Sequence, residues 1–281
     1  MHNIFSLLQS GAHLLREARV VDPFGSAGEL LAHILRKRRS LLFVIGDTKV
    51  DDASSAKYFA LIRRRAKREP LDYLLGSKEF LGCRIVLSEA VFIPRQETEL
   101  LTHYALREIP DGDRSLWDLC TGTGCIGLGI KKARPKLRIT LSDLSREALS
   151  SAEENGRING LSVLFRQGDL LTPFHGLKAD FITCNPPYVA DEEYPLSEPE
   201  VLYEPASALV AGKTGLEFYE RLARELPPLL NPGARLFLEI GHTQGEAVSS
   251  LFSDTHWTDR KILNDFSGKS RFCFVTYETH A

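Results

Sequence analysis

A short motif, Asn185-Pro186-Pro187-Tyr188, carries groups suited to holding a planar, nitrogen-bearing substrate. Pro186 restricts Asn185 to extended backbone angles, and this fixes the direction of an amide that offers one acceptor and two donors. Tyr188 adds a flat apolar face with a polar tip, and Pro187 stiffens the loop. Because the motif follows the apolar run 181–184, we expect it at the end of a buried strand. The alternative is a proline-rich turn that ends a strand and does nothing more.

A second set of polar residues follows the ends of earlier apolar runs. The loop Cys120-Thr121-Gly122-Thr123-Gly124 contains glycines that let backbone approach a ligand closely. Asp143 ends the next run and is placed to accept hydrogen bonds from ribose hydroxyls, while Asp169, followed by Leu170, ends the third and can accept from an adenine amino group. Singly, each aspartate is equally a helix cap or a loop carboxylate. Together they predict a nucleoside pocket that lacks the lysine of a phosphate-binding loop.

These residues need a scaffold that brings several strand ends to one edge. Beyond residue 111 strands and helices alternate, which predicts an α/β fold with a largely parallel, seven-stranded sheet covered by helices on both faces. Ligands bind at the C-terminal edge of such a sheet. The expected strands are Ser115–Leu119, 137–141 ending at Asp143, 162–165, 180–184, 234–239, and two more near 261–263 and 272–275. The expected helices are 124–133, a Ser145-capped helix to about Ile158, and 215–230, with a poorly periodic connection at 189–213.

The first part of the chain has a different pattern. Apolar residues at helical spacing, divided by breakers near Pro23, Gly25 and Gly46, predict a small helical domain at residues 1–72. Short alternating runs predict a β-hairpin linker at 73–95. The remaining residues, 96–281, form the predicted α/β domain, whose first helix begins near Gln96.

Composition narrows the class of protein. Of the 281 residues, 43% are hydrophobic and 26% are charged, as in ordinary globular proteins, and no long uncharged apolar run predicts a membrane span. Five cysteines without a Cys-x-x-Cys pair, and scattered histidines, predict neither a disulfide framework nor a metal site. We therefore expect a cytoplasmic protein without a membrane partner. Basic clusters at 36–39 and 63–68 are either a footprint for an acidic partner or a solvated helix face.

The core pattern resembles class I S-adenosylmethionine-dependent methyltransferases that modify amino groups. Outside that core the chain is similar to the release-factor glutamine methyltransferases (the PrmC/HemK family), a resemblance that covers essentially the whole chain. The segments that show this resemblance are Arg68–Gly76, Phe92–Glu99, Tyr203-Glu204-Pro205 and Leu238–Gly241. The chain departs from the family pattern where Cys120 replaces a glycine and Gln96 replaces a proline.

The resemblance implies an activity, a cofactor and a partner. S-adenosylmethionine would be held by the loop Cys120–Gly124 and by Asp143, Asp169, Leu170 and Asn185. The substrate would be the glutamine of the Gly-Gly-Gln motif in class 1 peptide-chain release factors, gripped in part by the helical domain. The residues implied in catalysis are Asn185, Pro186, Pro187, Tyr188 and Phe92.

Two other functions remain open on the sequence. A nucleic-acid amino-methyltransferase acting on adenine or guanine would use the basic clusters as its grip, although the acidic remainder of the chain would repel phosphates, so we do not expect a nucleic-acid partner. An inactive cofactor-binding scaffold is favoured by Cys120 alone. For the methyltransferase we expect a monomer.

Overall fold

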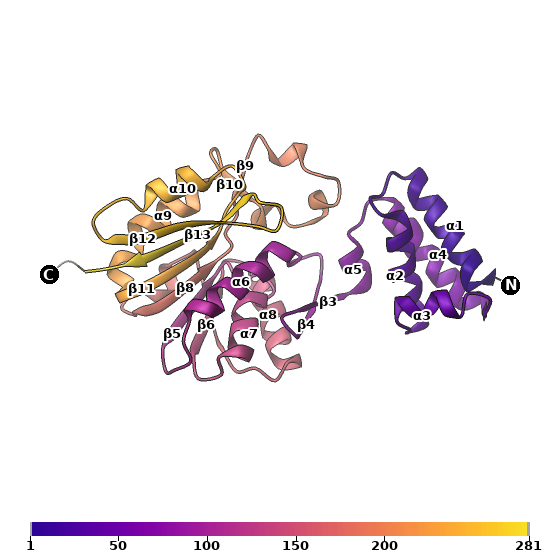
Figure 1. Cartoon of the computed structure of the whole chain (residues 1–281), viewed down its shortest axis with the longest axis horizontal. Coiled ribbons are helices and arrows are strands. Elements are labelled where there is room, and N and C mark those ends of the chain that lie inside the picture. The colour runs from indigo at the N-terminus through magenta and orange to yellow at the C-terminus, as the bar shows by residue number, and fades with distance from the viewer. Residues whose placement is uncertain (1, 280–281) are drawn as a thin grey trace. The chain divides into compact units, whose positions relative to one another are not determined.

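The computed structural model describes residues 2–279, and these divide into two compact units. The first unit contains the residues up to Ser77 together with the segment Glu198–Tyr203. The second contains Lys78–Ser197 and the chain from Glu204 onward. The chain therefore crosses between the units three times, and each unit is described by itself (Figure 1).

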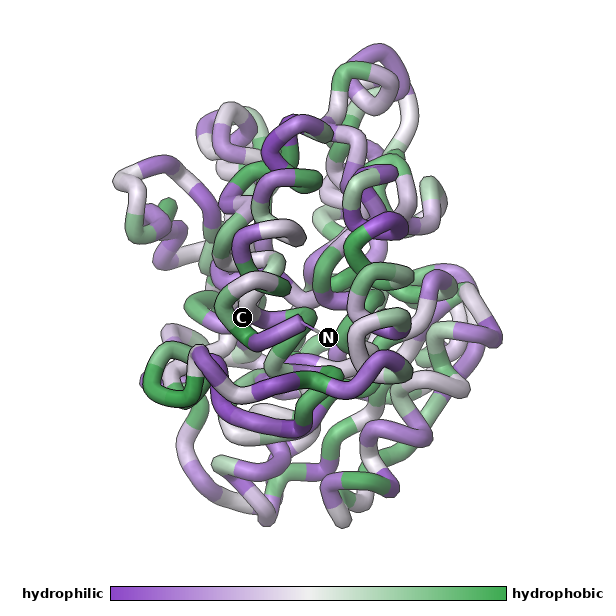
Figure 2. Tube along the Cα trace, turned by 90° about the vertical axis from the view of Figure 1, so that its right-hand side faces the viewer, coloured by the Kyte–Doolittle hydropathy of each residue, from purple (hydrophilic) through white to green (hydrophobic). Residues whose placement is uncertain are grey.

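The first unit is helical, as predicted. Its helices are α1 (Ile4–Glu17), α2 (Pro23–Leu35), α3 (Arg39–Val44), α4 (Asp52–Ala66) and α5 (Leu71–Leu75), with a two-stranded sheet of β1 (His2–Asn3) and β2 (Lys49–Val50). Polar residues at the helix starts explain the boundaries, since Asn3, Asp22 and Asp51 each accept a hydrogen bond from the first turn. In Figure 2 hydrophobic and hydrophilic stretches alternate along the coiled parts of the tube, as expected for helices with one buried face.

One of the two basic clusters is largely engaged inside this unit. Arg65 and Arg68 both form ion pairs with Glu200, and the side chain of Arg65 is only 7% exposed. Arg64 pairs with Glu69, and the Tyr203 hydroxyl donates to the Lys67 carbonyl oxygen at 2.8 Å. The cluster at 63–68 thus anchors the segment 198–203, and three of its basic side chains pair with carboxylates within the unit.

The second unit is built on a seven-stranded sheet in the order β12-β13-β11-β8-β5-β6-β7. Its strands are β5 (Ser115–Leu119), β6 (Arg138–Asp143), β7 (Leu164–Gln167), β8 (Ala179–Cys184), β11 (Leu230–Glu239), β12 (Trp257–Asn264) and β13 (Ser270–Tyr277). All pairings are parallel except those of β13, which runs antiparallel to β11 and β12. The chain runs outward from β5 to β7 and returns on the other side of β5 as β8. This reversal creates a topological switch point, where ligands bind in open α/β sheets.

Helices cover both faces of this sheet (Figure 1): α6 (Gln96–Glu108), α7 (Cys125–Ala133), α8 (Arg146–Ile158), α9 (Glu217–Glu225) and α10 (Gly245–Leu251). Alternate strand residues such as Trp117, Ile182 and Leu236 form one buried cluster with α9 and α10. The intervening residues face the opposite side of the sheet because side chains alternate along strands. A hairpin of β3 (Ser77–Phe80) and β4 (Cys83–Val86) precedes α6, as predicted.

Several element predictions were inaccurate, and β11 starts four residues earlier than the predicted strand 234–239. The predicted helix 215–230 is shorter: α9 ends at Glu225, and a 3-10 turn follows at Pro227–Leu229 because proline lacks the amide hydrogen that an α-helix needs. Strand β7 starts two residues later than predicted, and α10 was not predicted. The connection 189–213 contains only short pieces, namely β9 (Val189–Ala190), β10 (Val210–Gly212) and three 3-10 turns.

Candidate active site

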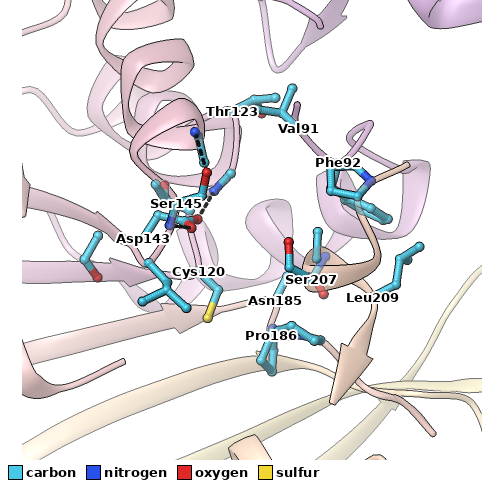
Figure 3. Close-up of a pocket in the computed structure, with 18 of the residues that line it drawn as sticks. Val91, Phe92, Cys120, Thr123, Asp143, Ser145, Asn185, Pro186, Ser207 and Leu209 are labelled. Carbon is cyan, nitrogen blue, oxygen red and sulfur yellow. Dashed lines mark hydrogen bonds between the residues drawn. The ribbon is translucent and has the colours of Figure 1, made fainter. Parts of the chain in front are cut away.

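One cavity opens at the C-terminal ends of β5, β6 and β8 (Figure 3). It is lined by every residue that the sequence marked as catalytic or cofactor-binding except Gly124. Further parts of its wall come from Val91, Phe92 and Pro94, which precede α6, and from Pro205, Ser207, Ala208 and Leu209 of the long connection. The fold therefore brings segments more than 80 residues apart in the sequence around a single space.

The loop after β5 has an unusual backbone. Cys120, Gly122 and Gly124 have positive φ angles of 52°, 53° and 80°. A Cβ added to Gly122 would meet nothing within 4 Å, whereas one added to Gly124 would lie 3.1 Å from the Cβ of Ala152. Gly122 thus leaves open space beside the cavity, and Gly124 permits close packing of the loop on α8. Gly122 therefore faces the space for a ligand, whereas Gly124 is needed for packing inside the protein.

A buried carboxylate beneath the loop holds it in place. Asp118 accepts hydrogen bonds from the Thr121 hydroxyl at 2.5 Å, the Thr183 hydroxyl at 2.7 Å and the Gly127 backbone amide at 3.2 Å. Burial raises the pKa of Asp118 to about 6 despite these donors. Asp118 therefore supports the loop from beneath and does not line the cavity.

Asp143 faces the cavity from the end of β6. Its Oδ2 accepts from the Gly122 amide at 2.8 Å and its Oδ1 from the Ser145 amide at 3.0 Å (Figure 3). Burial raises the pKa of this carboxyl, while the two backbone donors oppose the shift. Carboxylate oxygens accept more than one hydrogen bond each. Asp143 therefore has acceptor capacity left for hydroxyl groups of a ligand.

Asp169 differs from Asp143. Both of its oxygens accept from the guanidinium of Arg221, at 2.9 and 3.0 Å, and its side chain is 49% exposed. The next residue, Leu170, is buried and has a φ of 50°, and it lines the cavity. No local signal in the sequence points to Arg221, which lies 52 residues away on α9.

The Asn185–Tyr188 loop is held from several sides. The Asn185 Nδ2 lies 3.3 Å from the Thr98 Oγ1, and the Tyr188 amide donates to the Leu209 carbonyl oxygen at 3.1 Å. The Gln244 Nε2 donates to the Tyr188 carbonyl oxygen at 2.9 Å. The loop is thus rigid through contacts with α6, the 189–213 connection and the start of α10.

Phe92 lies on a second wall that depends on a buried ion pair. Glu204, whose side chain is 1% exposed, accepts from the Ile93 amide at 2.9 Å and pairs with Arg95. The Arg95 guanidinium in turn lies 4.7 Å from the centre of the Phe92 ring. Gln96, where the family pattern has proline, is the first residue of α6. The helix therefore starts at this position without the proline that often occupies it.

Sequence reasoning did not identify Thr98, Glu204, Glu239 or Ser207 as site residues. Thr98, Glu204 and Glu239 lie within segments that carry the family resemblance, and this signal could have drawn attention to them. Within residues 2–279, no group of three or more His, Cys, Asp or Glu side chains could hold a metal ion. No helix in the same range is long and apolar enough to cross a membrane.

We expect Cys120→Gly to stabilise the protein by about 0.5–1 kcal/mol, because glycine adopts positive φ without the steric cost that a Cβ imposes. Cofactor affinity should stay the same or increase. Chemical denaturation and calorimetry measure the two quantities. Cys120→Ala is the matched control, since it keeps the Cβ and should give no gain. Equal stability of the two variants would show that the backbone of residue 120 is not strained.

Comparison with known proteins agrees with the geometry. Residues 86–212 match the model of the methyltransferase small domain, and residues 6–76 match that of the PrmC N-terminal domain. The chain is 38% identical over 273 residues to a release factor glutamine methyltransferase of Chlamydia trachomatis serovar L2, covering 96% of this chain and 92% of the relative. It is 36% identical to the Deinococcus radiodurans protein of the same name, with 95% of each chain covered.

A solved methyltransferase structure from Pyrococcus furiosus superposes with a TM-score of 0.56 at 18% identity, covering 78% of this chain and 99% of that one. At this identity the likeness concerns the fold alone. The predicted Rossmann-like α/β fold with its seven-stranded sheet is confirmed.

Proposed function

The chain belongs to the release factor glutamine methyltransferase family, and we propose that it methylates the side-chain amide nitrogen of the glutamine in the Gly-Gly-Gln motif of class 1 peptide-chain release factors. One observation carries the proposal: the Asn185–Tyr188 loop and the glycine loop after β5 open into the same cavity. An amide-binding loop and a nucleoside-binding loop therefore meet at one site. A translation-factor substrate implies a cytoplasmic enzyme, and we propose that it acts as a monomer.

The cavity fits S-adenosylmethionine, which supplies an electrophilic methyl group on a sulfonium centre when it is bound. We assign the ribose hydroxyls to Asp143, the adenine edge to Asp169 and Leu170, and the methionine part to the loop Cys120–Gly124. The open space beside Gly122 supports the last assignment, because a side chain there would project toward the cavity. The spare acceptor capacity of Asp143 supports the first.

The reacting amide needs positioning more than activation by a base. An amide nitrogen is a poor nucleophile, because its lone pair is delocalised into the carbonyl group. We propose that the Asn185 Oδ1 and the Pro186 carbonyl oxygen accept hydrogen bonds from the two amide N–H groups of the substrate glutamine. Tyr188 and Phe92 would pack on the amide and exclude water, with Pro187 holding the loop rigid. Such orientation contributes several kcal/mol to lowering a barrier.

The lining of the cavity is consistent with this mechanism. Among the described residues, no histidine, lysine, arginine or glutamate lines it. The nitrogen can lose its proton to water after methyl transfer, since the methylated amide nitrogen is then strongly acidic. A dedicated general base is therefore not required.

We propose that the helical domain, residues 1–72, grips the release factor. The runner-up function, methylation of a nucleic-acid amino group, is not favoured: the curated relatives that cover nearly the whole chain are named for release factors. In the second basic cluster, three side chains also pair with Glu69 or Glu200.

The test is mass spectrometry of a purified class 1 release factor after incubation with this protein and S-adenosylmethionine. We expect one added methyl group on the glutamine of the Gly-Gly-Gln motif, and none when that glutamine is replaced by glutamate. Methylation of DNA or ribosomal RNA in a parallel reaction, with binding that weakens steeply as salt rises, would support the runner-up instead.

A further inference from the structure

A buried carboxylate that the proposed mechanism does not use lies behind the substrate loop. Glu239, the last residue of β11, is 1% exposed, and its Oε2 accepts from the Thr98 hydroxyl at 2.8 Å. Thr98 lies in the first turn of α6 and is 2% exposed. The Tyr219 hydroxyl donates to the Glu239 backbone carbonyl at 2.7 Å and anchors the strand end. Placing a carboxylate here costs free energy, because burial penalises its charged form.

The same threonine contacts the catalytic amide. The Thr98 Oγ1 lies 3.3 Å from the Asn185 Nδ2, so Glu239, Thr98 and Asn185 form one continuous chain of hydrogen bonds. A hydroxyl has one proton to donate and lone pairs to accept with. Ionised Glu239 can only accept hydrogen bonds, so the Thr98 hydroxyl must donate its hydrogen to Glu239. The threonine can then only accept from Asn185.

This direction of bonding determines which end of the amide faces the substrate. The Asn185 side chain must turn its Nδ2 toward Thr98, and its Oδ1 then lies on the opposite side. The two ends of an asparagine amide are nearly equivalent in shape. Without such a chain of hydrogen bonds, rotation of the amide by half a turn would therefore exchange them. A rotated amide would present donors to the donors of the substrate and would repel it.

We propose that Glu239 and Thr98 are positioning residues, which act through Asn185 to keep its amide oxygen directed at the substrate amide. This inference rests on the proposed function, in which the Asn185 oxygen accepts from the glutamine N–H. It also explains why a carboxylate is present at a buried strand end.

The protonation state of Glu239 controls this orientation. Burial raises the pKa of Glu239 to about 7, the Thr98 hydroxyl and the charges of Arg271 and Arg95 oppose the shift, and Glu97 adds to it. The other titratable groups that interact with it are Tyr188, Tyr219 and Cys125. Below this pKa the protonated carboxyl can donate to Thr98, whose own proton is then free to point at the Asn185 oxygen. The constraint is therefore present above about pH 7 and lost below it.

The first experiment compares two substitutions of one residue. Thr98→Val keeps the shape and removes the hydroxyl, so we expect kcat to fall about tenfold or more while cofactor affinity is unchanged. Thr98→Ser keeps the hydroxyl and should retain most of the activity, although it opens a small cavity in the core. Thr102→Val is the matched control, since Thr102 is also buried on α6 and its hydroxyl donates to the Thr98 backbone carbonyl at 2.8 Å rather than to Glu239 or Asn185. Its turnover should match that of the unmodified protein.

The second experiment uses pH. The unmodified protein should show a kcat that rises with pH through about 7. Glutamine both donates and accepts, so Glu239→Gln should lower kcat and abolish this rise. Its thermal stability at pH 8 should equal or exceed that of the unmodified protein, because a buried charge has been removed. A slow variant that is at least as stable cannot be explained by misfolding.

A third readout does not depend on activity. In a ¹⁵N-labelled sample, the side-chain amide signal of Asn185, assigned by its loss in Asn185→Asp, should move toward solvent-like shifts in Thr98→Val and on acidification. If no release factor is methylated, the proposed function fails, and this signal still decides the inference. If methylation occurs, an unchanged signal and unchanged kcat in Thr98→Val overturn the inference. The inference is also overturned if kcat falls in proportion to the loss of thermal stability in both Thr98→Val and Thr98→Ser.

Discussion

Replacement of Asn185 by alanine is expected to reduce kcat by roughly 10²–10³-fold, the usual cost of removing a preorganised hydrogen-bond acceptor or donor from an active site. The side chain lies at the end of β8, on a loop held at Tyr188 by Leu209 and Gln244, so the backbone should keep its place after truncation. The loss falls on the transition state, because the amide oxygen orients a weak nucleophile.

Cofactor affinity should change little in this variant, within about threefold, because the acceptors assigned to the ribose lie on Asp143 and not on Asn185. Calorimetry with S-adenosylmethionine and a methylation assay on a release factor separate the two effects. Asn185→Asp is a useful companion, since it retains oxygen acceptors but cannot donate to Thr98. Undiminished turnover in Asn185→Ala would contradict the assignment of the loop as the amide-binding element.

Local signals in the sequence were sufficient for the parts of the site that are continuous in the chain. The glycine loop after β5 and the Asn185–Tyr188 loop each follow an apolar strand, and strand ends in a parallel sheet share one edge. Ser145 caps α8 through its bond to the Ala148 amide, as its type and position indicate. Hydrophobic periodicity, helix-capping residues and turn residues are signals that span only a few positions, so they can be recognised in a single sequence.

The missing parts depend on contacts between distant residues. Thr98 and Glu239 are separated by 141 positions, and Ile93 and Glu204 by 111. The family resemblance and the apolar strand draw attention to Glu239, but nothing in its local sequence shows that it meets Thr98. Which side chains meet across α6 and the sheet is decided by strand order and helix packing, and these follow from the whole fold.

The two aspartates at neighbouring strand ends illustrate the same limit. In the sequence, Asp143 and Asp169 have equivalent positions, and both were predicted to bind the nucleoside. In the structure Asp143 is half-buried and accepts hydrogen bonds from two backbone amides, while Asp169 is half-exposed and paired with Arg221. Their contributions to binding should therefore be unequal, and this leads to a quantitative expectation.

We expect Asp143→Ala to weaken S-adenosylmethionine binding by about 10–100-fold, because hydrogen bonds to a charged group contribute roughly 1.5–3 kcal/mol. The fold should survive. Burial raises the pKa of Asp143, so the folded state binds the carboxyl proton more tightly than the unfolded state does. Above the ordinary pKa of an aspartate, the ionised carboxyl therefore lowers the stability of the fold. Removing it should not lower the melting temperature at neutral pH, and circular dichroism measures this.

Two variants give this prediction its controls. Asp143→Asn keeps one acceptor for either Gly122 or Ser145 and should bind with intermediate affinity. Asp169→Ala should lose less than Asp143→Ala, because both Asp169 oxygens are already bonded to Arg221 and the neighbouring Leu170 still lines the cavity. Calorimetric affinities for the three variants rank the contributions. A loss in Asp169→Ala that equals or exceeds that in Asp143→Ala would mean that the Arg221 pair opens when the cofactor binds, and that the adenine edge is held more strongly than the ribose.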